Sequence, residues 1–117
     1  MIGPLEVPRL EDLRDFSIVI EELDEPGVVS IMAWARDGDT VTLTWDEIAC
    51  SAHIRWLDGD DQRLVLERET ASKVSVRDEH GSIQFRVWTR SNGLVSELVV
   101  DVGAHVSVQD AMLRVIS

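Results

Sequence analysis

Apolar and polar residues alternate through most of this chain, and turn-forming residues interrupt the alternation at short intervals. A period of two is typical of β-strands that bury one face, because successive side chains of a strand point to opposite sides. The dipeptides Asp37-Gly38 and Asn92-Gly93 are strong signals for two-residue hairpin turns. The pattern therefore predicts an antiparallel meander of about seven strands, curved or barrel-like.

Two segments depart from this alternation and indicate helices. Residues 8–15 include Pro8, which suits the first turn of a short helix. Near the other end, Ser107 is a suitable N-cap, and the segment from Val108 to Ile116 carries apolar residues along one side. The predicted fold class is therefore α+β, with a short N-terminal helix and a C-terminal helix docked on the sheet.

The two hairpin turns also predict registers. A two-residue turn at Asp37-Gly38 would place Trp34 opposite Val41 and Met32 opposite Leu43, and would turn Trp34 and Trp45 toward the core.

For the hairpin at Asn92-Gly93, the same reasoning places Val87 opposite Leu98 and Phe85 opposite Val100. Residues 44–52 fit either a helical turn or an extended segment, because Thr44 to Glu47 matches a capping box while the residues that follow alternate. From residue 52 onward we expect a strand.

The length of 117 residues is that of one domain, so residues 1–117 are expected to form a single globular unit. No apolar run approaches the roughly 18 residues that a membrane-spanning helix requires. The segment from Met1 to Arg9 lacks the basic start and apolar stretch of a signal peptide. Because Cys50 is the single cysteine, the chain has no internal disulfide. These features predict a cytoplasmic protein.

The chain is strongly acidic, with a formal net charge of −11. Residues 1–60 hold fourteen acids and four arginines, a balance of −10. Binding to nucleic acid or to an anionic membrane needs a basic surface, so both are disfavoured. The acidity either serves solubility or steers the protein toward a basic partner.

No spacing in the chain predicts catalysis, a metal site or a cofactor. Cys50 and His53 would lie on opposite faces of a strand, which does not suit a nucleophile and its base. His53, His80 and His105 are too far apart for a local metal motif. We therefore expect no catalytic residues, no bound metal and no cofactor, and favour a protein that is not an enzyme.

The strongest candidate site is the outward face of the hairpin closed by Asn92-Gly93. Six side chains share this face: Arg86, Trp88 and Arg90 on one strand, and Val95, Glu97 and Val99 on the other. Tryptophan and arginine are enriched at protein interfaces, where they supply large contact areas and charge-assisted hydrogen bonds. The alternative is that one of the predicted helices covers this face and makes Trp88 a core residue.

Together these features predict a non-enzymatic binding domain that acts through protein–protein contact. One concrete form is an immunity-type or antitoxin-like inhibitor of a basic partner. The alternative is a small-molecule-binding domain or an enzyme whose pocket is enclosed by a curved antiparallel sheet, lined by aromatic residues and holding one buried acid. A homodimer formed through the Trp88 face or an open sheet edge is a third hypothesis.

Overall fold

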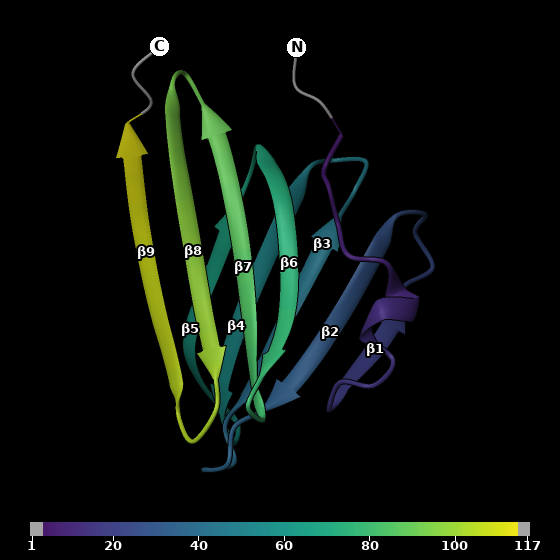
Figure 1. The fold of residues 1–117 in the computed structure, drawn as a ribbon, viewed down its shortest axis with the longest axis vertical. Helices are drawn as coiled ribbons and strands as arrows, with labels where there is room; N and C mark the ends of the chain where they lie inside the picture. The colour runs from purple at the N-terminus through teal and green to yellow at the C-terminus, as the bar shows by residue number, and fades with distance from the viewer. Residues whose placement is uncertain (1–3, 115–117) are drawn as a thin grey trace.

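The computed structural model describes residues 4–114, and the side chains of residues 4–111. Within this range, nine strands form two antiparallel meanders that pack face to face as a β-sandwich (Figure 1). The first sheet contains β1 (Ile18–Glu22), β2 (Val28–Trp34), β3 (Thr40–Asp46), β4 (Ser51–Asp58) and β5 (Asp61–Arg68). The second contains β6 (Ala71–Glu79), β7 (Ser82–Ser91), β8 (Leu94–Val102) and β9 (Val106–Arg114).

The predicted α+β class is wrong, because the described chain is nearly all β. The predicted single meander of about seven strands, curved or barrel-like, is wrong too, because the described strands form two sheets of five and four. Where a C-terminal helix was expected from Val108 to Ile116, β9 pairs with β8 along its full length (residues 115 and 116 lie outside the described range). Val106 and Val108 are β-branched and lie opposite Val102 and Val100. Pairing in this register satisfies the backbone groups along one side of β8 and extends the apolar inner face, which a helix at this position would not do.

The predicted N-terminal helix is reduced to a single 3-10 turn, η1 (Leu10–Leu13). Leu13 from this turn is 2% exposed and joins the core. The segment before it runs beside β6, where the Glu6 N–H donates to the Ser72 carbonyl at 3.1 Å and the Val74 N–H donates to the Glu6 carbonyl at 2.8 Å. This segment therefore covers part of the outer edge of the second sheet.

The register predicted from Asn92-Gly93 is confirmed. Val87 lies opposite Leu98, and Phe85 lies opposite Val100. Asn92 and Gly93 have φ values of 50° and 76°, as a two-residue turn with two left-handed residues requires.

The register predicted from Asp37-Gly38 is wrong by one residue. The Ala35 N–H donates to the Asp39 carbonyl at 2.8 Å, and the Gly38 N–H donates to the Ala35 carbonyl at 3.0 Å. This is a turn followed by a bulge at Gly38 and not a two-residue loop. Trp34 consequently lies opposite Thr40, faces outward and is 50% exposed.

Residues 47–50 form a turn between β3 and β4, so the extended interpretation holds from Ser51 onward. The Asp46 carboxylate accepts hydrogen bonds from the N–H groups of Ile48, at 3.0 Å, and Ala49, at 2.9 Å. Asp46 therefore caps this turn, a role that the sequence pattern had indicated for Thr44.

The space between the sheets is filled by apolar side chains, of which Trp45 and Phe85 are the largest that are fully buried. Of the described residues classed as buried, Ser96 alone is polar. The buried acid required by the enclosed-pocket alternative is therefore not found among them.

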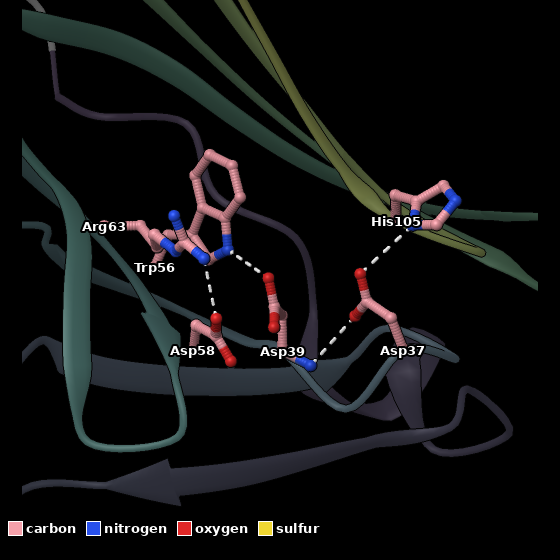
Figure 2. Close-up of polar contacts among 6 residues, drawn as sticks. All are labelled: Asp37, Asp39, Trp56, Asp58, Arg63 and His105. Carbon is pink, nitrogen blue, oxygen red and sulfur yellow. Dashed lines mark hydrogen bonds and ion pairs between the residues drawn. The ribbon is translucent and has the colours of Figure 1, made fainter.

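Loop contacts join the two sheets at one end of the sandwich. The Arg36 N–H in the β2–β3 loop donates to the Gly103 carbonyl in the β8–β9 turn at 2.8 Å. Polar side chains cluster near the same loops (Figure 2). The Trp56 indole N–H donates to Asp39 at 2.9 Å, and Arg63 pairs with Asp58 at 2.7 Å.

Candidate protein-binding surface

The six residues predicted as a site lie together on the outer face of the second sheet. The β7–β8 register places Arg86 opposite Val99, Trp88 opposite Glu97 and Arg90 opposite Val95. Their chain neighbours Phe85 and Val87 are buried between the sheets, so alternation turns the six outward. We call this set (Arg86, Trp88, Arg90, Val95, Glu97 and Val99) the Trp88 surface.

Neither of the predicted helices covers the Trp88 surface. The C-terminal segment that was expected to form such a cover is β9, which lies beside β8 in the same sheet (Figure 1). Trp88 is half-buried by its neighbours on the sheet, and the Lys73 ammonium lies over its ring, 5.3 Å from the centroid. A lysine ammonium over the face of an indole is a favourable cation–π contact.

Hydrogen bonds fix the polar members of this surface. Arg86 donates to Gln84 at 2.7 Å and to Glu97 at 2.9 Å, and Gln84 donates to Asp101 at 2.9 Å. Arg86 and Glu97 are therefore oriented before any partner arrives. The Arg90 guanidinium is exposed and has no side-chain partner among the described residues, so it is the more available cation.

A groove of about 300 Å³ lies beside Trp88 and extends the surface onto β6. It is lined by Lys73, Ser75, Arg77, Arg86 and Trp88. Three cations around one groove suit an acidic group. The sequence analysis missed the β6 residues, although Val74 and Val76 point inward and their alternation would have placed Lys73, Ser75 and Arg77 on this face.

A row of partly apolar residues on the outer face of the first sheet was also missed. Val19, Met32, Thr42, Arg55 and Val65 form one row across the five strands of its outer face. Val19 is 52% exposed and Val65 is 38% exposed. Trp34, which is half-exposed, lies on the same outer face of β2, two residues after Met32.

Residues 4–114 hold no group of three or more His, Cys, Asp or Glu side chains arranged to bind a metal ion. Cys50 lies in the β3–β4 turn, whereas His53 lies on β4 opposite Thr44. Among the described residues there is no helix with the length and apolar character that a membrane crossing requires.

No family model and no curated protein matches the sequence. Among solved structures, a chain of the contact-dependent growth inhibition toxin–immunity protein complex from Klebsiella pneumoniae 342 is similar to this one, with a TM-score of 0.71. The match covers 92% of this chain and 96% of that chain, at 12% sequence identity. At this identity the likeness shows that the two chains share a fold.

Proposed function

We propose that this protein is an immunity-type protein of the cytoplasm that binds a basic toxin by direct protein–protein contact and thereby neutralises it. The observation that carries the proposal is the shared fold, which spans nearly the whole of both chains. The similar chain belongs to a complex of a toxin with its immunity protein. A shared fold does not by itself specify a function, so the proposal also depends on the charge and the exposed surface of this chain.

The charge of the chain favours the immunity role and a basic partner. A net charge of −11 on 117 residues creates a field that attracts a basic protein and accelerates its association. The Trp88 surface supplies the kind of contact that holds such a complex, since a half-buried tryptophan beside arginines is typical of interface centres. The three cations of its groove fit a carboxylate on the partner.

Co-expression with the products of the adjacent genes tests this proposal. We expect one of them to co-purify in a stable complex, to inhibit growth when expressed alone, and to be harmless when this protein is present. Light scattering would give the stoichiometry and would separate a hetero-complex from a homodimer. The proposal is wrong if no adjacent gene product binds at low ionic strength, where electrostatic attraction is strongest.

A further inference from the structure

A second groove, of about 300 Å³, opens between the N-terminal segment, the β1–β2 turn and the β3–β4 turn. Its walls include three carboxylates, from Glu22, Glu25 and Glu47, and the apolar side chains of Leu10, Leu23 and Trp45. We call it the acidic groove. It lies within the first sixty residues, where nearly all the excess negative charge of the chain is found.

The three carboxylates of the acidic groove have no counter-ion among the side chains that the structure describes. Glu22, Glu25 and Glu47 are exposed, and none of them forms an ion pair with another described residue. None of the described residues that line the groove is a lysine or an arginine. Like charges that share a groove repel each other, and a bound cation would relieve this repulsion.

Trp45 provides a second, independent feature of this groove. It lines the groove but is only 1% exposed, and its indole N–H has no hydrogen-bond partner. An indole N–H is a donor only, so it needs an acceptor oxygen, and native structures seldom leave such a group buried without one. The nitrogen itself has almost no accessible surface, so a ligand carbonyl would supply that acceptor only after the side chains that cover it shift.

Two of the three walls of the groove, the β1–β2 turn and the β3–β4 turn, are tied to each other before binding. The Glu47 N–H donates to the Gly27 carbonyl at 2.9 Å, which ties the β3–β4 turn to the β1–β2 turn. A Cβ atom at Gly27 would lie 3.4 Å from Ile48 Cγ1 and 3.5 Å from Glu47 Cβ, so the two turns are in van der Waals contact. A preformed groove loses less entropy on binding than a flexible one.

We propose that the acidic groove binds a basic segment of the partner protein, in which an arginine or lysine side chain lies among the three glutamates. A backbone carbonyl of the same segment accepts the hydrogen bond of the Trp45 indole, and the aliphatic part of the basic side chain packs on Leu10 and Leu23. This inference rests on the proposed function for the nature of the partner, and it adds the location and chemistry of one contact.

The test uses nuclear magnetic resonance and the peptide acetyl-Ala-Arg-Ala-Arg-amide as a probe. The indole N–H resonances are assigned from single Trp→Phe variants. We expect the Trp45 indole resonance and the backbone resonances of residues 22–27 and 47 to shift saturably, and the indole resonance of Trp34 to stay in place. Guanidinium chloride, a cation without a carbonyl, should leave the Trp45 indole resonance unshifted.

Two triple variants with equal changes in net charge provide the control. Replacing the groove acids (Glu22→Gln, Glu25→Gln, Glu47→Gln) should weaken peptide binding by about tenfold or more. Replacing three exposed acids elsewhere (Asp60→Asn, Glu69→Gln, Asp78→Asn) should have a much smaller effect. The inference is overturned if the Trp45 indole does not respond at about 10 mM peptide, or if both triple variants weaken binding equally.

The same variants separate this inference from the proposed function. If an adjacent gene product binds and the groove variant binds it as tightly as the control variant does, the groove inference fails and the proposed function stands. If the peptide binds in the groove but no adjacent gene product forms a complex, the proposed function fails and the groove remains a site for basic peptides.

Discussion

The imidazole Nδ1 of His105 lies 3.2 Å from Oδ2 of Asp37, and this contact joins the β8–β9 turn of one sheet to the β2–β3 loop of the other (Figure 2). The second carboxylate oxygen of Asp37 accepts the Asp39 N–H at 2.9 Å. The Asp39 N–H, followed by His105, lowers the pKa of Asp37 below the ordinary value for an aspartate. The ionisation of the Asp37 carboxylate therefore affects a contact that joins the two sheets.

This lowered pKa predicts a pH dependence of stability. Below about pH 4 the unfolded chain protonates Asp37 while the folded chain still holds it ionised, so the stabilisation is lost as the pH falls through the lowered folded-state pKa. Asp37→Asn keeps an oxygen that can accept the Asp39 N–H but removes the charge. We expect this variant to be less stable than the wild type near pH 6 and equally stable at the lowest pH, measured by urea denaturation.

Asp60→Asn is the matched control, because it changes the net charge by the same amount. Asp60 lies in another turn and forms no hydrogen bond or ion pair with a described side chain. The linkage is refuted if the stability difference between Asp37→Asn and the wild type stays constant from neutral to acid pH.

Removing the indole N–H should destabilise the fold less at Trp45 than at Trp56. Trp45 is buried with an unpaired N–H, whereas the Trp56 N–H donates to the Asp39 carboxylate at 2.9 Å. An unpaired buried donor costs about 1–3 kcal/mol, which offsets the volume that Trp45→Phe removes. We expect Trp45→Phe to cost less than about 1 kcal/mol and Trp56→Phe about 1–2 kcal/mol, since the latter loses a charge-assisted hydrogen bond.

Urea denaturation followed by circular dichroism would give both values. If Trp45→Phe costs more than Trp56→Phe, the Trp45 N–H has an acceptor in solution, and the argument for a ligand carbonyl in the acidic groove is weakened.

The Asn92-Gly93 turn predicts a purely conformational effect at Gly93. Gly93 has a φ of 76°, and a Cβ atom there would meet no other atom within 4 Å. Gly93→Ala should therefore lower the free energy of unfolding by about 1 kcal/mol through the left-handed backbone alone.

Gly103→Ala offers a contrast, because a Cβ at Gly103 would lie 2.6 Å from the Ser82 Oγ. A Ser82→Ala background should therefore reduce the cost of Gly103→Ala and leave the cost of Gly93→Ala unchanged. Equal rescue of both alanine variants would contradict this assignment of causes.

The two hairpin turns explain how much of the fold could be predicted. Asn92 and Gly93 both adopt left-handed conformations, so their preferences fix the turn and the register of β7 with β8. At Asp37-Gly38 the left-handed residue is Gly38, and the loop is held by Ala35 and Asp39 and by backbone contacts to Gly103 and Ala104. Those contacts come from another sheet, so local sequence did not reveal the one-residue shift.

The C-terminal strand and the grooves were missed for a similar reason. The apolar residues from Val108 onward fit a short helix as well as a strand, and the free side of β8 decides between them. The Trp88 surface could be predicted because it depends on a single hairpin. The acidic groove could not, since it brings together Leu10, Glu25 and Glu47 from three separate segments.

The role of the Trp88 surface leads to a last prediction, for which Trp34 is the natural comparison. Both indoles lie on outer sheet faces, but Trp34 lies opposite Thr40 on the first sheet, whereas Trp88 has Lys73, Arg86 and Glu97 around it. Trp88→Ala should cost about 1–2 kcal/mol of stability, from the lost burial of part of the ring and the lost cation–π contact. Its effect on affinity for the co-purified partner should be at least about 2 kcal/mol, or roughly thirtyfold, as for a residue at an interface centre. Trp34→Ala should leave that affinity within about threefold of the wild type. Isothermal titration calorimetry on the two variants checks this difference, and the reverse order would assign the interface to the first sheet and show that the Trp88 surface does not bind the partner.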